Sequence, residues 1–406
     1  MNNTLSIPPR TTMTLETVNG DLEIGKHAIV QGTGNPPGVK VTGAVYCEGN
    51  NVFECSLSAE EFEAENSVTV HGELEIEGDV EVEDGCLEVS GDMKVGSVDV
   101  DNSLFVSKNL VATEVEVGGS LRVDGNTFVE DADVGGSFGA KGEVKAESVE
   151  VGGSLLVDSK VDIKAIDVGG TASVAGGIIR EIDVGGAFES KGPLEFERID
   201  VGGTVELVGS CKGGEIEVGG LLRANGDLEF ERLEAGGRVQ VRGRTQGKDM
   251  EVGGTVNIDG SLQLAGTLEV GGRADISGEV VTRNTQIGGS LRARKLTSQE
   301  RVEVGGSINT GDGVTAHSVE IGNRGIVHGP IQADEIDIGR GAEVEDLRGK
   351  HIVLRNGASA GNVYGEDLTI DSHCRINGEV MYTNELRQGE HVQYAQSPRR
   401  VASFPR

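Results

Sequence analysis

Apolar and polar residues alternate over most of the chain, in short segments interrupted by paired glycines. Between Val115 and Val123, valine and leucine occupy every second position on both sides of Gly118-Gly119. Alternation with a period of two places successive side chains on opposite faces of a β-strand. No segment shows a sustained helical period of 3.6. The pattern therefore predicts an all-β protein built from short strands.

The glycine pairs recur at a nearly constant interval, which averages about 17 residues. Their first members are Gly118, Gly135, Gly152, Gly169, Gly185, Gly202, Gly219, Gly236, Gly253, Gly271, Gly288 and Gly305. A fixed period of this length is typical of solenoids, in which each repeat is one coil that buries its apolar face against its neighbours. We therefore predict a single long parallel β-helix with about 17 residues per coil.

Each repeat has the same arrangement of side chains around its glycines. The residue two before the pair is acidic except at Gln286, and the residue directly before it is valine or isoleucine except at Ala235. The aliphatic residue is expected to face the core and the acid the solvent. The glycines are expected to form a corner that needs positive φ and close approach between stacked backbones. Aromatic residues make up only 3% of the chain, which suits a narrow core.

The regularity of the repeat divides the chain into segments. The continuous β-helix is expected to run from about residue 15 to 388, with roughly 20–22 coils. The expected segments are a disordered N-terminal segment (1–14), an irregular β-helix (15–95), the regular glycine-pair β-helix (96–311), a C-terminal β-helix (312–388) and a disordered basic tail (389–406). Within the irregular part, Gly32–Gly38 is expected to be a loop, and Ser58–Asn66 either a short helix or a bulge.

The chain is strongly acidic, with a formal net charge of −31. Coils stack about 4.8 Å apart, so carboxylates aligned on neighbouring coils repel by roughly 0.9 kcal/mol per pair in unscreened water. At about 1 M salt the Debye length falls to about 3 Å and most of this repulsion disappears. The charge thus favours a halophilic protein in a salty cytoplasm, and an acidic surface kept for solubility is the alternative.

Targeting signals are not evident. The N-terminal residues lack the charged and apolar regions of a signal peptide, and no run of eighteen apolar residues occurs. We expect a cytoplasmic protein, including at the cytoplasmic face of the membrane. A nucleic-acid partner is not expected, because only the last dozen residues are basic.

Motifs that carry chemistry are few. Gly135-Gly136-Ser137-Phe138-Gly139 matches the G-x-S-x-G elbow of serine hydrolases, but that elbow requires a strand-turn-helix, whereas this one lies at a predicted corner. Calcium along the acid columns is the alternative to a solvated face, which we favour because a column of single carboxylates does not enclose a cation. We expect no catalytic site, cofactor or metal. The cysteines are expected to be buried or idle thiols, in preference to a disulfide or metal site. They are Cys47, Cys55, Cys86, Cys211 and Cys374.

The C-terminal part of the chain resembles a known family. An Ile-Gly-x-Gly-Ala-x-Val turn is present at 338–344. Strand patterns of the Gly-x-[Ile/Val] type follow at 361–363 and within 376–380, with the strand-like Leu368-Thr369-Ile370 between them. These segments, and a weaker copy at 20–32, resemble the bactofilins, which are polymer-forming cytoskeletal proteins, and in particular the archaeal type called halofilins. The resemblance implies a right-handed β-helix and end-to-end homopolymers. It also implies contact with a membrane-anchored partner protein or the inner membrane surface. The chain differs from the short bactofilin plan in its far longer rod and its strict glycine-pair corner.

These observations favour a non-enzymatic cytoskeletal scaffold that self-assembles into filaments or bundles and supports cell shape. Solenoids that remain monomeric need polar caps, exposed edges recruit further strands, and no cap helix is evident. The candidate self-assembly residues of the end coils are Leu15, Leu22, Ile24, Ile370, Ile376, Val380, Met381, Tyr382 and Leu386. Val380→Arg is expected to block assembly and leave the fold intact. Ordinary core packing is the alternative interpretation of these residues.

An acyltransferase on a left-handed β-helix is the main alternative function. Val117, Val123 and Val129 are six residues apart, as in hexapeptide repeats, but a coil of about 17 residues breaks that period each time. A projecting loop with a catalytic histidine and a helical C-terminal cap are not visible. A surface adhesin would require a signal peptide and exposed aromatic residues, and neither is evident.

Overall fold

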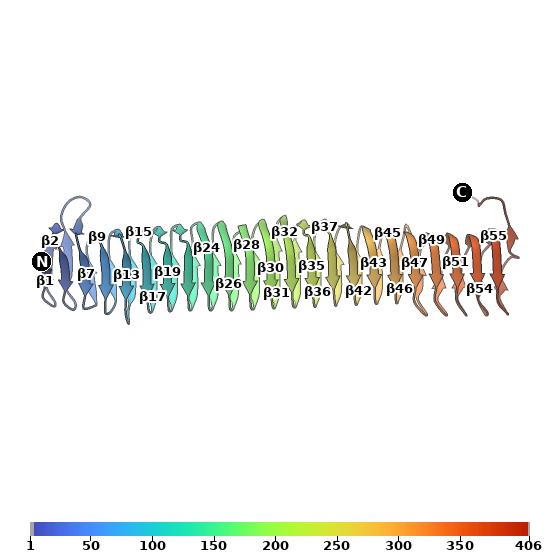
Figure 1. Ribbon diagram of the computed structural model, residues 1–406, viewed down its shortest axis with the longest axis horizontal. Helices are drawn as coiled ribbons and strands as arrows, with labels where there is room; N and C mark the ends of the chain where they lie inside the picture. The colour runs from blue at the N-terminus through green and yellow to red at the C-terminus, as the bar shows by residue number, and fades with distance from the viewer. Residues whose placement is uncertain (1–3, 405–406) are drawn as a thin grey trace. The chain divides into compact units, whose positions relative to one another are not determined.

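The computed structural model describes residues 4–404. Residues 1–3 of the predicted N-terminal segment and 405–406 of the predicted tail lie outside the described residues. The chain divides into two compact units, Met1–Gly202 (unit 1) and Gly203–Arg406 (unit 2). Between residues 4 and 404 every regular element is a β-strand (Figure 1). Each unit is a parallel β-solenoid with about 17 residues per coil, which confirms the predicted fold class.

One coil contains three strand segments that pair with the same segments of the next coil. In unit 1, Leu110 pairs with Thr127, Val115 with Ala132, and Leu121 with Phe138, so each partner lies one full coil further along. The first two segments of a coil belong to one sheet, which we call sheet A, and the third belongs to sheet B. The segments of this coil are β18 (Leu110–Val111), β19 (Glu114–Val117) and β20 (Ser120–Val123), which pair with β21 (Thr127–Phe128), β22 (Asp131–Val134) and β23 (Ser137–Ala140).

In several later coils the two sheet A segments join into one longer strand, as in β24 (Val144–Val151) and β26 (Val161–Val168), whereas others keep them separate, as β34 (Leu228–Glu229) and β35 (Arg232–Ala235). Sheet B keeps one strand per coil. In unit 1 these strands are β2 (Thr12–Leu15), β5 (Ile29–Gly32), β8 (Asn51–Phe53), β11 (Val68–Val70), β14 (Cys86–Val89), β17 (Ser103–Val106), β20, β23, β25 (Ser154–Val157), β27 (Thr171–Val174) and β29 (Ala187–Ser190). In unit 2 they are β31 (Thr204–Val208), β33 (Leu221–Asn225), β36 (Arg238–Val241), β39 (Thr255–Ile258), β42 (Arg273–Ile276), β44 (Ser290–Ala293), β46 (Ser307–Thr310), β48 (Ile326–His328), β50 (Glu343–Val344), β52 (Ser359–Ala360), β54 (Arg375–Ile376) and β56 (Gln393–Tyr394).

Each unit buries a core of aliphatic side chains. Val117, Leu121 and Val123 are at most 1% exposed, whereas Glu116 between two inward residues is exposed. This is the inward and outward alternation that the sequence predicts. Phenylalanine fills a few inward positions, such as Phe138, which stacks between Leu121 and Leu155 in neighbouring coils. The apolar columns are the main source of stability, since each coil hides its apolar side chains only against the adjacent coils.

The glycine pairs form corners, as predicted, but only half of the predicted reason is correct. A Cβ atom on Gly136 would lie 2.5 Å from the carbonyl oxygen of Gly119 in the preceding coil. The close approach of stacked backbones therefore requires glycine. Positive φ is not a reason for these glycines. Within the described chain the glycines with positive φ lie outside the repeated pairs, for example at Gly176 and Gly226.

The structure differs from the prediction at both ends of the chain. Strand β1 (Thr4–Ile7) lies within the segment predicted to be disordered and pairs with β4 (Asp21–Ile24). Strands β56 and β57 (Arg399–Arg400) lie within the predicted disordered tail and pair with β54 and β55 (Val380–Gln388). The coil beneath each segment supplies free hydrogen-bonding groups, so these short polar segments gain pairing partners that their composition does not reveal. Within residues 4–404, unit 1 has eleven coils and unit 2 twelve, slightly more than predicted, because these segments add coils.

The irregular N-terminal segment is also clarified. The residues from Ser58 to Asn66 form neither a helix nor a bulge, because β9 (Ser56–Ala59) and β10 (Glu61–Ala64) meet there at a corner. The loop predicted at Gly32–Gly38 is present as a turn between β5 and β6 (Gly38–Val41). The right hand of the helix stays a prediction.

Candidate functional site

The N-terminal coil has strand edges without a partner inside the chain. Within residues 4–404, β1 pairs only with β4, β2 only with β5, and β3 (Thr17–Val18) only with β6. The side chains of Leu5, Met13 and Leu15 are half-buried, because no coil covers them from outside. Alternate backbone N–H and C=O groups of an edge strand point away from the sheet, so this edge can accept another strand.

The C-terminal coil has a second open edge. Strand β55 pairs along its length with β53 (Val363–Ile370), whereas β57 covers only Met381 and Tyr382 on its other side. In the described chain, residues 384–388 have no strand on that outer side. Leu386 in this stretch and Tyr394 in β56 are half-buried. This open edge therefore combines unpaired backbone with partly exposed apolar side chains.

The nine predicted self-assembly residues divide into two groups. Three are half-buried at the open edges, namely Leu15 at the N-terminal coil and Tyr382 and Leu386 at the C-terminal coil. The others are core residues, at most 1% exposed except Met381 at 9%, namely Leu22, Ile24, Ile370, Ile376, Val380 and Met381. For Leu22, Ile24, Ile370 and Ile376 the physical reason is a further strand, since β1, β55 and β56 lie outside them.

The structure overturns the expected outcome of Val380→Arg. Val380 is 1% exposed and pairs with Val363, so an arginine there would place a charge in the core. Burying an unpaired charge is strongly unfavourable. This substitution is therefore expected to damage the last coils and is unsuitable as a test of assembly. The half-buried Leu386 on the same strand is the better position.

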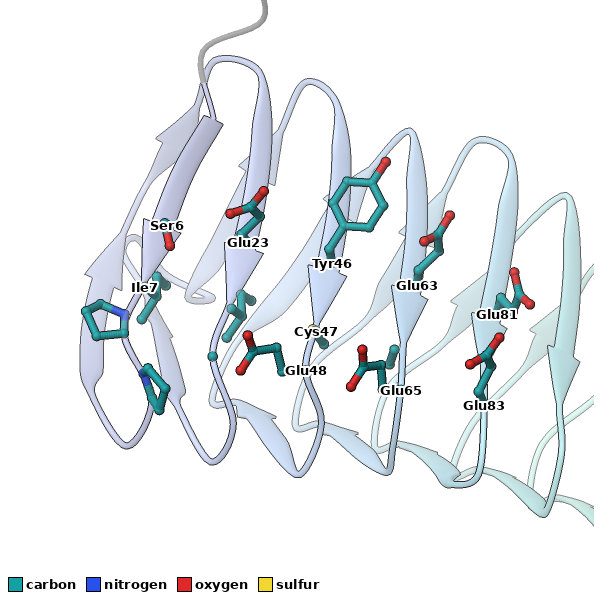
Figure 2. Close-up of a pocket in the computed structure, with 15 residues that line it drawn as sticks. Ser6, Ile7, Glu23, Tyr46, Cys47, Glu48, Glu63, Glu65, Glu81 and Glu83 are labelled. Atoms are coloured by element: carbon teal, nitrogen blue, oxygen red, sulfur yellow. The ribbon is translucent and has the colours of Figure 1, made fainter.

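A groove near the N-terminal end gathers many carboxylates (Figure 2). Pro8 and Pro9 bound one side, and its volume is about 470 Å³. Two columns of outward side chains on successive coils line it. One column is Glu23, Tyr46, Glu63 and Glu81, and the other is Glu48, Glu65 and Glu83. We call this feature the acidic groove. It lies beside the first coil, whose strand edges are open.

Burial and the charges of neighbouring carboxylates raise pKa values in the acidic groove. Partial burial raises the pKa of Glu63, and the charges of Glu81, Glu61 and Glu83 raise it further. The pKa of the Tyr46 phenol is also raised, first by burial and then by the carboxylates around it. Lys26 Nζ lies 3.8 Å from Glu65 Oε2, and both side chains are more than half exposed. The groove therefore holds excess negative charge and attracts cationic groups.

Sequence reasoning missed the acidic groove. The available signal was Tyr46, which stands in the outward column where acids are the rule. Among the described residues, no group of three or more His, Cys, Asp or Glu side chains is arranged to hold a metal ion. The carboxylates point outward from separate coils, as Figure 2 shows, so they create a field and not an enclosed ligand set.

The other sequence candidates have plain structural roles. Ser137 of the elbow-like motif lies in β23, where its hydroxyl group is 3.1 Å from that of Ser120 in the preceding coil. It is not on the strand-turn-helix of a hydrolase nucleophile. Among the five cysteines, Cys86 is exposed and the other four are buried. Burial raises the pKa of Cys55 to about 11, so its reactive thiolate is scarce near neutral pH.

Comparisons with protein-family models, with curated proteins and with solved structures found no match. No helix long and apolar enough to cross a membrane is present between residues 4 and 404. The open coil edges and the acidic groove are therefore the features of the chain that bear on its function.

Proposed function

We propose that this protein is a non-enzymatic cytoskeletal scaffold of the bactofilin-like, halofilin type, which self-assembles into filaments or bundles and supports cell shape. The observation that carries the proposal is the pair of open coil edges. Each combines unpaired backbone groups with half-buried leucine side chains, Leu15 at one end and Leu386 at the other. The principal partner is another copy of the same chain.

Two features make the edges suited to association. A parallel edge strand offers hydrogen bonds to any strand of matching direction, and proteins that stay monomeric usually block such edges. In the described residues no helix covers either end. A second copy would bury Leu5, Met13 and Leu15, or Leu386 and Tyr394, and would gain the hydrophobic stabilisation that these side chains lack in a single chain.

The charge of the chain sets the conditions for assembly. With a net charge of −31, two copies repel at low ionic strength. Salt at molar concentration screens this repulsion. We propose that the protein works in a salty cytoplasm, with a membrane-anchored protein or the inner membrane surface as a further partner.

The alternative, an acyltransferase on a left-handed β-helix, would need a histidine base near a binding hollow. His317 is the residue that such an activity would use: its Nδ1 lies 3.1 Å from Asp334 Oδ2, and both residues line a hollow of about 450 Å³ in unit 2. Both side chains are substantially exposed, which is common for surface ion pairs. Acyl transfer from an acyl thioester that is lost in His317→Ala would favour this alternative.

Electron microscopy in negative stain, across a salt series from dilute buffer to multimolar KCl, tests the scaffold. We expect filaments or bundles whose abundance rises with salt. Leu15→Glu and Leu386→Glu should each suppress them without unfolding the chain, because both positions are half-buried. Leu156→Glu is the matched control, since Leu156 is 43% exposed on an interior coil. Discrete single particles at every salt concentration would reject the scaffold.

A further inference from the structure

The C-terminal segment turns back on the coils that precede it. After β55 the chain forms β56, then β57, and then continues to Phe404; in Figure 1 it arches away from β55 and returns toward earlier strands. We call residues 395–404 the C-terminal strap. It is the last described part of the chain and lies at the open edge of β55.

The strap is attached to β55 by backbone pairing and by two arginines. Met381 pairs with Arg399 and Tyr382 with Arg400, and the amide of Val401 donates to the carbonyl oxygen of Tyr382 at 2.9 Å. Arg399 Nη2 lies 3.1 Å from Glu379 Oε1. Arg400 Nε donates to the carbonyl oxygen of Thr383 at 3.1 Å. The strap thus occupies the first part of the edge that a second copy would need.

The end of the strap is held by an aromatic contact. The ring of Phe404 lies 6.3 Å from that of Tyr364, with a tilt of 35° between the ring planes. The hydroxyl group of Tyr364 donates to Glu379 Oε2 at 3.4 Å, so one carboxylate contacts both Tyr364 and Arg399. Phe404 also borders the hollow described above, beside the small side chains of Ala316, Ala333 and Gly349 on successive strands.

We propose that the C-terminal strap is an autoinhibitory cap, which competes with a second copy of this chain for the outer edge of β55. The inference rests on the proposed function, because it names what regulates the C-terminal contact. When the strap is docked, the stretch of β55 open to a second copy is residues 384–388. When it is released, Met381 and Tyr382 become available, and the open edge lengthens toward the start of β55.

The contacts of the strap suit a reversible cap. The ion pair between Arg399 and Glu379 is partly exposed, so salt weakens it. The pairing of β57 covers only two residues, and Phe404 is half-buried. A second copy would bury a whole coil face, including Leu386, and would displace a strap held by so few contacts. High salt therefore acts twice, because it weakens repulsion between copies and loosens the strap.

Hydrogen–deuterium exchange and assembly kinetics, measured on the same full-length variants, test the cap. Phe404→Ala and Arg399→Glu should each speed amide exchange in residues 399–401 about tenfold and shorten the lag of assembly severalfold. The double charge reversal Arg399→Glu with Glu379→Arg should restore the slow amide exchange and the long lag of the wild type. Arg180→Glu is the control, since Arg180 is an exposed arginine on an interior coil that pairs with Glu197 and touches neither the strap nor the open edge.

The possible outcomes separate the cap from the scaffold. Faster exchange with unchanged assembly kinetics would overturn the cap and leave the scaffold standing. Slower assembly in the released variants would also overturn it, because the strap would then belong to the interface. Absence of assembly in the wild type and in every released variant would reject both the scaffold and the cap. Faster exchange, faster assembly and rescue by the double reversal together would support the cap.

Discussion

At the scale of the residue, the glycine pairs show which property of glycine a β-solenoid uses. A Cβ atom on Gly119, Gly136 or Gly153 would come within about 2.5 Å of a backbone carbonyl oxygen in the preceding coil. That oxygen belongs to backbone and cannot rotate away. The pairs therefore repeat because each corner packs directly against the backbone of the corner before it, whatever residue stands there: the Cβ of a residue at Gly119 would meet the carbonyl oxygen of Asn102 in the same way.

Replacing one glycine of a pair should consequently destabilise the protein. Gly136→Ala is expected to lower the free energy of unfolding of unit 1 by about 1–3 kcal/mol, the usual cost of overpacking. Gly139→Ala, three residues away, is the matched control, because its Cβ would meet nothing within 4 Å and its φ is not positive. The control should be neutral or stabilising by about 0.5 kcal/mol. Urea unfolding followed by circular dichroism distinguishes the two; equal destabilisation would contradict the packing explanation.

Two buried threonines allow a second test at this scale. Thr245 is fully buried between Leu228 and Leu262, and its hydroxyl oxygen has no hydrogen-bond partner in the described structure. Thr245→Val should raise the stability of unit 2 by about 1 kcal/mol, because it removes an unsatisfied polar group and keeps the shape.

Thr285→Val is the comparison for Thr245→Val. The hydroxyl groups of Thr285 and Thr282 are 2.7 Å apart in the core, so this change breaks a made hydrogen bond. It should lower stability by about 1 kcal/mol. Opposite signs for the two substitutions are expected in thermal unfolding, and the same sign would show that hydroxyl satisfaction does not govern this core.

At the scale of the element, the outward side of sheet A carries a column of acidic side chains whose like charges repel one another. Asp183 pairs with Asp167 on one side and Asp200 on the other. Partial burial raises the pKa of Asp183, and these two carboxylates raise it further, while Arg198 opposes them. A raised folded pKa contributes stability below the ordinary value of 3.8, and this contribution is lost as the pH rises through the folded value.

Asp183→Asn should therefore stabilise unit 1 at pH 7 and low salt, by about 0.3 kcal/mol once solvent screening is included. The gain should shrink in about 1 M KCl and disappear below the pKa. Asp334→Asn should do the opposite, since Lys350 and His317 lower the pKa of Asp334 and its contribution is lost only as the pH falls. Melting temperatures of both variants across pH and salt give the test; a salt-independent gain for Asp183→Asn would argue against the charge column.

Most of each coil was predictable from the sequence, whereas the terminal strands of the chain were not. The alternation around each glycine pair identifies the inward residues, because every coil repeats the same environment. Ile7 and Arg399 have no such repeat to mark them, so the terminal strands escaped prediction. The burial of Leu22 depends on β1 beyond it, and this explains why core and edge residues could not be separated from the sequence. The acidic groove was missed because it arises from columns on several coils.

At the scale of the whole molecule, the two open edges are complementary in strand direction. Successive coils pair in parallel, as β1 does with β4 and β53 with β55. The N-terminal edge of one copy can continue this parallel pairing on the C-terminal edge of the next, whereas two like edges would meet with their strands antiparallel. We therefore predict a polar polymer.

Mixing two blocked variants tests the polarity. Leu15→Glu closes the N-terminal edge and Leu386→Glu the C-terminal edge. Neither alone should associate if contacts run from the N-terminal to the C-terminal end, because each variant then lacks one of the two edges that every contact needs. An equimolar mixture should form dimers and no larger species in analytical ultracentrifugation. Dimers in either variant alone would indicate contacts between like ends.

The constant register of the coils determines how such a chain can change length. Partners in the regular part of unit 1 lie one coil apart, as Ser120, Ser137 and Ser154 do in sheet B. Deleting or duplicating one complete coil, such as residues 120–136, therefore leaves every remaining residue opposite an equivalent partner. A gene can lose or gain such a block without a compensating mutation elsewhere. Each event alters the unit by about 4.8 Å, the spacing of one strand. The length of such a solenoid can therefore change in equal steps of one coil.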